Sequence, residues 1–189
     1  MTFDLATAKA RLNIPVVDVT KDASVQLSLD TALALAETYC NRKFTYAAET
    51  ATFHYPFAQV LQLSRYPLEQ VVSVTSNTTL LDASTYQVVL GTGQVKSSGW
   101  MSGNSIDVTY AGGYKILPPD LLLALWGIFD KVWAASSGAA VSDRIVNSIQ
   151  IPDVGTVKYE SPNATAAASV GLIPATSVAM LDFYRLEVC

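Results

Sequence analysis

The sequence contains few of the residues that metal centres, disulfide frameworks and histidine-dependent catalysis require. Its 189 residues include only two cysteines and one histidine. Cys40 lies within a helical pattern and Cys189 is the last residue, which does not make a disulfide framework, so we expect both thiols to be reduced. No histidine, cysteine or acidic residues have the spacing of metal ligands. We therefore predict neither a metal site nor a cofactor.

Catalytic motifs are missing as well. A serine or cysteine nucleophile would have to use His54, and none lies in the strand–turn–helix context of a nucleophile elbow. We interpret His54 as a structural or surface residue. The glycines at 91–93 and 112–113 lack the rest of a dinucleotide or P-loop fingerprint. We therefore predict no catalytic residue and no enzyme activity. A hydrolase with paired carboxylates is the alternative, and a pocket with perturbed carboxylates would support it.

Charged residues are sparse, and their balance is acidic. They make up 15% of the chain, and sixteen Asp and Glu residues outnumber twelve Lys and Arg residues, which gives a formal net charge of −4. The longest basic run is Arg42-Lys43. Because a protein that grips DNA through its phosphates needs many cations, tight binding of nucleic acid is disfavoured.

No segment has the features of a membrane span or of an export signal. Residues 116–133 are strongly apolar, but Pro118, Pro119, Asp120 and Asp130 interrupt the run. The start of the sequence lacks the basic residues and the apolar stretch of a signal peptide. We expect a buried helix at 116–133 and no contact with a membrane.

Half of the residues are apolar, which is enough for a sizeable packed core. Four segments have apolar residues at the three- and four-residue spacing of helices, with capping or proline signals at their ends. Arg42 and Lys43 follow the second of these segments, where cations favour a helix C-terminus. The predicted helices are residues 5–12, residues 22–41, a helix opened by Pro118 and Pro119, and a helix opened by Pro174.

Between the second and third helices, the pattern has the two-residue period of strands, with turn signals between segments. A tight turn is expected at 91–93, and a low-complexity loop or linker of Ala, Ser and Thr at 163–171. The predicted strands and extended segments are 50–54, 60–63, 71–77, 86–90, 94–96, 106–110, 144–151 and 155–159.

These elements predict an α+β fold, in which a small helical bundle carries an inserted β-rich module and a C-terminal docking helix. We expect four successive parts. They are the first helices at 1–47, the β-rich module at 48–115, the rest of the helical domain with an extended segment at 116–162, and the linker with the docking helix at 163–189.

Five stretches of the chain, in order, resemble the motifs of head–tail connector (adaptor) proteins of tailed bacteriophages. The similarity runs from about residue 5 to residue 185. The stretches are the helix 29–44 with Arg42 and Phe44, Tyr66-Pro67 with residues 71–74, the strand–helix junction 106–124 with Gly113-Tyr114, the extended segment 148–159, and the closing helix 174–185 with Leu181, Tyr184 and Arg185.

The resemblance implies a structural protein without a catalytic role or cofactor. Members of that family are expected to form a dodecameric ring below the portal protein and to join it to tail, stopper or nozzle proteins. DNA would pass through the ring without specific binding, which suits the acidic charge. The resemblance places the protein in the neck of the virion, after assembly in the host cytoplasm.

Candidate contact residues lie in the closing helix and in one loop. We expect the closing helix to dock on the portal or on a neighbouring subunit through a mainly apolar set: Leu181, Phe183, Tyr184, Arg185 and Leu186. Trp100 is either a tail-side contact in its loop or an anchor folded back on the sheet. Trp126 and Trp133 lie seven residues apart on one helix and are either core or subunit interface.

Two other functions stay open. A stopper or tail-completion protein would also form a ring in the neck. A monomeric β-rich module that binds carbohydrate or protein would use Trp100 and the tyrosines, and it would work without assembly. The oligomeric state therefore separates the binding module from the ring proteins.

Overall fold

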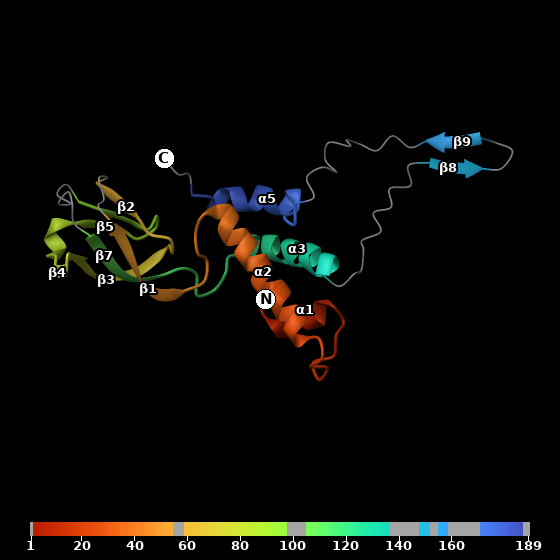
Figure 1. Ribbon diagram of the computed structural model, residues 1–189, viewed down its shortest axis with the longest axis horizontal. Helices are drawn as coiled ribbons and strands as arrows, with labels where there is room; N and C mark the ends of the chain where they lie inside the picture. The colour runs from red at the N-terminus through yellow and green to blue at the C-terminus, as the bar shows by residue number, and fades with distance from the viewer. Residues whose placement is uncertain are drawn as a thin grey trace. The chain divides into compact units, whose positions relative to one another are not determined.

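The computed structural model describes residues 2–54, 59–97, 105–136, 148–151, 155–158 and 171–186. Helices and antiparallel sheets both occur (Figure 1), which confirms the predicted α+β class. The chain divides into two compact units. Unit 1 comprises Met1–Ala36 and Leu122–Phe183, and unit 2 comprises Glu37–Leu121 and Tyr184–Cys189.

Unit 1 is built from helices α1 (Leu5–Arg11) and α5 (Ala175–Leu181) and from most of the longer helices α2 (Asp22–Cys40) and α3 (Pro119–Ser136). Helix α1 begins after Asp4, whose side chain accepts a hydrogen bond from the Thr7 amide. Buried side chains recur at helical spacing, so each helix presents one apolar face to the core. They include Val25, Leu29, Ala32 and Ala36 of α2, and Leu125, Trp126, Ile128 and Phe129 of α3.

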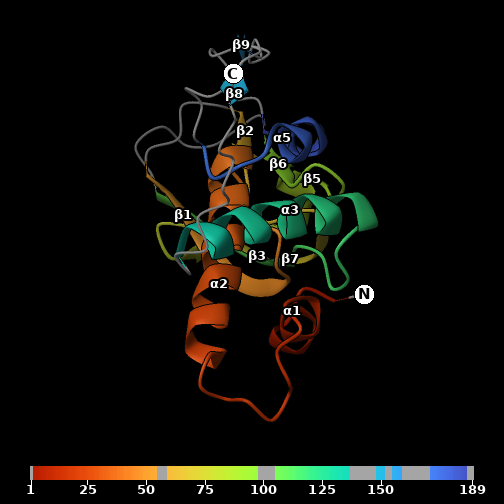
Figure 2. The ribbon, with the colours of Figure 1, turned by 90° about the vertical axis from the view of Figure 1, so that its right-hand side faces the viewer.

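Helix α5 packs alongside α3, as Figures 1 and 2 both show. The Ser177 hydroxyl donates a buried hydrogen bond to the Ala124 carbonyl oxygen at 3.0 Å. The approach is close at Gly127, where a Cβ would lie 2.6 Å from the Ser177 Oγ. Leu181 is fully buried at the end of the same helix. A glycine on α3 therefore makes room for the closing helix.

Unit 2 contains two antiparallel sheets. The first has the order β1 (Ala47–His54), β7 (Ser105–Gly112), β3 (Leu68–Ser76) and β4 (Thr79–Leu80), and the second has the order β2 (Val60–Gln62), β6 (Gln94–Lys96) and β5 (Gln87–Val89). A 3-10 turn, η1 (Ala83–Thr85), precedes β5. Alternate residues of both sheets meet in one apolar core. Its fully or nearly buried members are Leu61, Leu63, Leu68, Val74, Val95, Ile106, Val108 and Tyr110.

Two hairpin turns set the strand register in unit 2. Asn77 and Thr78 both have positive φ between β3 and β4, the conformation of a two-residue hairpin turn. Gly93, also with positive φ, ends the turn between β5 and β6 that was predicted from its glycines. Pairing of β1 with β7 is regular over eight residue pairs, whereas β3 pairs with β7 across two bulges.

A third sheet is a separate hairpin of β8 (Ser148–Ile151) and β9 (Gly155–Lys158). Their antiparallel pairing runs from Ser148 opposite Lys158 to Ile151 opposite Gly155. After α5, a 3-10 turn η2 (Asp182–Tyr184) leads into the closing residues. The linker predicted at 163–171 lies, except for its last residue, outside the described residues.

Within the described ranges, no helix combines the length and the hydropathy that a membrane span needs. In the same part of the chain, no three His, Cys, Asp or Glu side chains are grouped so that they could hold a metal ion. Cys40 is buried and forms no disulfide with any described residue, and Cys189 lies outside the described residues.

Candidate functional site

Residues from several of the motifs that carry the family resemblance meet in unit 2, beginning at the end of α2. Asn41 adopts a left-handed conformation, the Asn41 amide donates to the Thr38 carbonyl, and the Arg42 amide donates to the Glu37 carbonyl. This is a Schellman cap, in which asparagine replaces the more usual glycine. The cap stops the helix at Cys40 and turns Arg42 away from the helix axis.

Arg42 lies at the centre of this cluster, and only 5% of it is exposed. Its guanidinium carbon lies 3.4 Å from the centroid of the Tyr66 ring, 5.2 Å from that of Phe44 and 5.5 Å from that of Tyr114. An Arg42 Nη2 hydrogen bond to the Tyr66 carbonyl oxygen completes the contact. Because the guanidinium is weakly hydrated and planar, it stacks on aromatic rings where an ammonium would not. We call Arg42, Phe44, Tyr66 and Tyr114 the arginine–aromatic cluster.

The backbone after β7 closes the cluster. The Tyr114 amide donates to the Phe44 carbonyl at 2.8 Å, and the Gly113 amide donates to the Pro67 carbonyl at 3.0 Å. Gly113 has a φ of +97°, and a Cβ there would lie 2.5 Å from the Thr45 carbonyl oxygen. Only glycine fits such a position. The Gly-Tyr motif is therefore a close backbone crossing and not a phosphate loop.

The closing segment of the chain packs on the same cluster. The Tyr184 ring meets Phe44 and Tyr114 edge to face, with centroids 6.0 and 6.4 Å apart. The Tyr184 hydroxyl donates to Asp120 Oδ2 at 2.7 Å, and the Leu186 amide donates to the Cys40 carbonyl at 3.0 Å. These contacts dock the end of the chain on its own unit 2.

The hydrogen bond between Tyr184 and Asp120 shifts both titrations. It lowers the pKa of the Asp120 carboxyl below its ordinary value of 3.8. Burial and the same hydrogen bond raise the pKa of the Tyr184 hydroxyl well above its ordinary value of 10.0. The depressed carboxyl pKa contributes stability above pH 3.8 that is lost as the pH falls through the folded value. The raised hydroxyl pKa contributes stability below pH 10 that is lost as the pH rises further.

Replacing Tyr184 with Phe tests this anchor. Because Y184F keeps the ring contacts and removes one hydrogen bond to a carboxylate, we expect it to lower the free energy of unfolding by about 1 kcal/mol at pH 7. Urea denaturation at several pH values should show the difference shrinking below about pH 4 and above about pH 10. Y86F is the control and should cost under about 0.5 kcal/mol. A Y184F effect that is constant from pH 3 to pH 11 would contradict the assignment.

The five residues predicted to contact the portal or a neighbouring subunit differ in their burial and in their contacts. Leu181 is fully buried, so, in contrast to the expectation, it does not belong to the exposed surface. Tyr184 and Leu186 make the contacts described above, and the Arg185 guanidinium lies 5.3 Å from the Tyr39 ring centroid. Phe183, which is 87% exposed, presents its ring to solvent. Trp100 lies outside the described residues.

His54 and two of the tryptophans, Trp126 and Trp133, lie within the described residues. His54 is exposed at the end of β1. Trp126 is buried in unit 1, where its ring meets Phe3 and Phe129 edge to face at 4.8 and 5.3 Å. Trp133, which is partly exposed, lies one heptad further along α3. Trp126 is therefore a core residue.

Perturbed carboxylates would be the mark of a hydrolase, and Glu49 is the best test of that alternative. Burial acts to raise the pKa of Glu49, but hydrogen bonds from Tyr110, Arg65 and Ser64 outweigh it and hold the pKa below its usual value. A carboxylate held ionised by three donors is a poor general acid. Its partners tie β1 to β7 and to the chain after β2, which is a structural role.

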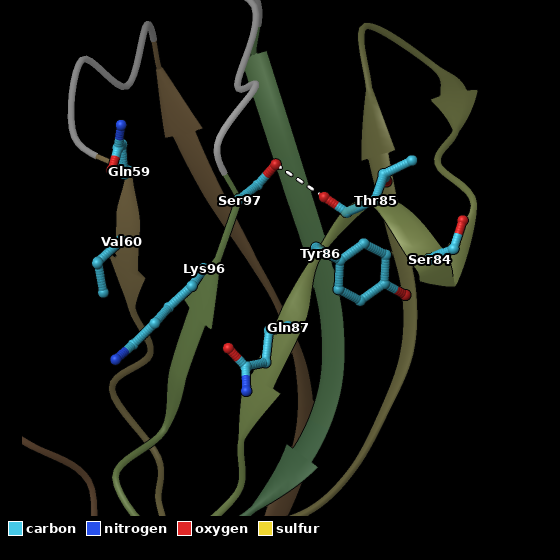
Figure 3. Close-up of a pocket in the computed structure, with 8 residues that line it drawn as sticks. All are labelled: Gln59, Val60, Ser84, Thr85, Tyr86, Gln87, Lys96 and Ser97. Atoms are coloured by element: carbon cyan, nitrogen blue, oxygen red, sulfur yellow. Dashed lines mark hydrogen bonds between the residues drawn. The ribbon is translucent and has the colours of Figure 1, made fainter.

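A shallow groove of about 360 Å³ lies on the second sheet (Figure 3). Lys96 sits between Val60 and Gln87, which are its partners on the neighbouring strands. The Ser97 hydroxyl donates to the Thr85 carbonyl oxygen at 2.9 Å and closes one end of the groove. The other lining residues are Gln59, Ser84 and Tyr86. Lys96 is the one charged residue of the lining, so the groove lacks the acid–base pair of a hydrolase.

The motif residues were identified from the sequence, but the contacts that they make with one another were not predicted. Arg42 was interpreted through the helix dipole, yet its guanidinium is buried against the nearby Phe44 ring and against the rings of Tyr66 and Tyr114 from two other segments. Glu37 was missed entirely. Its carboxylate accepts hydrogen bonds from the Phe44 amide and from Lys43 Nζ, both at 2.9 Å. An acid one turn before the helix end, followed by Arg, Lys and an aromatic residue, is the signal that could have indicated it.

Comparison with protein families decides the classification. The model of the family described as "Head completion protein" matches residues 10–130, which contain the arginine–aromatic cluster and both sheets of unit 2. The chain belongs to the head completion protein family. This membership confirms the resemblance to head–tail connector proteins, and it places the chain among structural proteins of the phage head–tail neck.

Solved structures with the same fold agree with the family. A chain from the virion of a native gene transfer agent (GTA) particle is 16% identical with a TM-score of 0.61, and the match covers 98% of this chain and 90% of that one. A chain from the neck of the empty GTA particle, computed with C6 symmetry, is 14% identical with a TM-score of 0.62 and the same coverage. A chain from the neck of the native particle, computed with C12 symmetry, is 15% identical with a TM-score of 0.58, over 98% of this chain and 91% of that one. Among curated proteins, none matches.

Proposed function

We propose that copies of this chain form a closed ring in the neck, which joins the portal vertex to tail components around the DNA channel. The observation that carries the proposal is the fold shared, over 98% of the chain, with chains of GTA necks computed with C6 and C12 symmetry, together with membership of the head completion family. A closed ring needs a heterologous interface, in which two different surfaces of the subunit meet.

Unit 1 has apolar surface suited to such contacts. The ammonium group of Lys9 is buried and donates to the carbonyl oxygens of Val16 and Asp18, at 2.9 and 2.8 Å, and to Asp22 Oδ1 at 2.6 Å. These bonds hold the loop between α1 and α2 in one conformation. Val16, Val17 and Val19 of that loop are 72%, 88% and 69% exposed. Ordered, stiff side chains lose little entropy when a partner covers them.

The charge of the chain suits a passive channel. The net charge of −4 repels the phosphates of DNA, so a ring lets the duplex slide without specific contact. We therefore propose that DNA passes through the ring without being bound specifically.

The mass of the assembly tests the ring. We expect native mass spectrometry of the purified protein with portal to show a portal-bound oligomer, and microscopy of particles to show the same copies in a ring. Finding only monomers in assembled particles would overturn the proposal and favour the binding module. A ring that binds tail proteins but not portal would instead identify a stopper or tail-completion protein.

Phe183 should be a contact of that ring or of the portal. Truncating an exposed aromatic anchor at an interface typically costs about 2 kcal/mol, which is about thirtyfold in affinity. We therefore expect F183S to fold with an unchanged melting temperature and to join portal-bearing heads about thirtyfold less well. The measurement is binding of the purified variant to such heads.

Ile116 provides the matched control for Phe183. It is 86% exposed in unit 2, so I116S removes a comparable apolar side chain from the surface. We expect I116S to bind heads like the unaltered chain. If both variants bind normally, Phe183 is not an anchor, and the proposed role of the closing segment is wrong.

A further inference from the structure

We propose that β1 is a docking edge for the β8–β9 hairpin of a neighbouring copy, so that the first sheet of each subunit is extended by the next subunit of the ring. This inference rests on the proposed ring. It assigns to that ring a main-chain contact between two named segments of this chain.

The first observation is the unpaired edge of β1. Strand β1 lies at the end of the order β1-β7-β3-β4, and its eight residues pair with β7 without a bulge. Within the described part of the chain, no other backbone group bonds to residues 47–54. In an antiparallel pair, about half of the backbone groups of an edge strand point away from the partner. These donors and acceptors form a template for another strand.

The second observation is that β1 lacks the devices that normally protect an edge. It contains no proline or lysine. Its one charged side chain, Glu49, is engaged by Ser64, Arg65 and Tyr110. Side chains on the outer face are small or neutral, and all are exposed: Ala48, Thr50, Thr52 and His54. An edge of this length and composition is expected to pair, because natural sheets otherwise block such edges.

The third observation is the hairpin itself. Strands β8 and β9 have four residues each and form a two-stranded sheet of their own. Among the described elements, neither strand packs extensively on any helix or strand except its partner. An isolated two-stranded hairpin is at best marginally stable in water, and a third strand is what it lacks. Its sequence, Ser-Ile-Gln-Ile with Gly-Thr-Val-Lys, is rich in β-branched residues and has one charge.

In the described part of the chain, each copy therefore carries a long open edge at β1 and a hairpin that needs an edge. In a closed ring, every subunit can receive a hairpin from one neighbour and give its own to the other, which is a heterologous contact. The main chain supplies the hydrogen bonds, so the contact tolerates the neutral side chains of β1. No like charges oppose each other, because β1 contributes only a carboxylate that is already paired.

A mixed assembly tests the contact between copies. One chain carries T52C and lacks residues 148–158, and the other carries T156C with its hairpin intact; both carry C189S. After assembly on portal-bearing heads, a short bismaleimide cross-linker should join the two chains into one adduct on a denaturing gel. Because the first chain has no hairpin, this adduct forms only between copies. Q87C on β5 replaces T52C in the control and should give no adduct.

Each result has one meaning. An adduct with T52C but not with Q87C supports the proposal. A further variant carries both T52C and T156C on one chain with its hairpin intact. If this variant is cross-linked only within single chains, the hairpin pairs in its own subunit, and the proposal is overturned. Rings that form without any adduct also overturn it, while the proposed function stands. If no ring forms from the unaltered chain, the proposed function fails and this contact fails with it.

Hydrogen exchange provides a second measurement that needs no cysteine. In the assembled ring, we expect peptides covering 47–54 to exchange at least tenfold more slowly than in the free subunit. Deleting 148–158 should abolish that protection while the melting temperature of the free subunit stays the same. Protection that persists in rings of the deletion variant would assign the edge to another strand, such as one from a tail protein, and would contradict this proposal.

Discussion

Replacing Gly113 with alanine should lower the free energy of unfolding by about 3 kcal/mol or more. The new Cβ would lie 2.5 Å from the Thr45 carbonyl oxygen and 3.0 Å from the Phe44 carbonyl oxygen, and the φ of +97° is unfavourable for any L side chain. The obstacle is backbone, which cannot move without breaking the hydrogen bond between the Tyr114 amide and Phe44. For a chain of this size, the loss corresponds to a fall in melting temperature of roughly 6–12 °C.

Gly91 makes the matched control for this change. A Cβ at Gly91 would meet no atom within 4 Å, and its φ is not in the left-handed region. We expect G91A to be neutral or to stabilise by up to about 1 kcal/mol, because alanine has fewer unfolded conformations. Urea denaturation of both variants is the measurement. Equal stabilities would show that the junction after β7 yields to a methyl group, contrary to the contacts described.

Replacing Arg42 with alanine should cost about 3 kcal/mol. The variant loses a desolvated cation–π contact with Tyr66, worth about 2 kcal/mol, and a charge-assisted hydrogen bond to the Tyr66 carbonyl. It also leaves a cavity between Phe44 and Tyr114. Because Tyr184 packs on both of these rings, the closing segment should loosen as well. Limited proteolysis at the C-terminus and urea denaturation together measure the two effects.

Two variants separate charge from shape at this position. R42K keeps the charge, but an ammonium cannot stack flat on Tyr66, so we expect it to recover less than half of the loss. K21A removes an exposed cation from unit 1 and should change stability by under about 0.5 kcal/mol. Full recovery with lysine would mean that charge alone, and not stacking in the arginine–aromatic cluster, is what Arg42 contributes.

Several local elements have the predicted bounds, or bounds within one residue of them. The helix expected at 5–12 is α1 (Leu5–Arg11), and the helix expected at 22–41 is α2 (Asp22–Cys40). Strand β6 (Gln94–Lys96) has the predicted bounds. Capping residues, prolines and alternating apolar residues are local signals, so a single sequence contains them.

The ends of strands were predicted less well. Strand β1 starts at Ala47, three residues before the expected start, because pairing with β7 continues through two alanines and Glu49, which have no strand signal of their own. Strand β4 was missed, since two residues are too few for an alternation pattern. Partners from elsewhere in the chain set these ends.

By itself, the sequence determined the α+β class, the absence of a nucleophile elbow, and the motifs by which the family was recognised. These depend on residue types and short spacings. Tertiary structure alone decided that Arg42 would be buried under Tyr66 and Tyr114, that Leu181 would face its own core, and that Phe183 would face solvent. Burial and stacking depend on which distant segments meet. The pattern of residues along the sequence does not specify these contacts, because packing of the whole chain determines which distant segments touch.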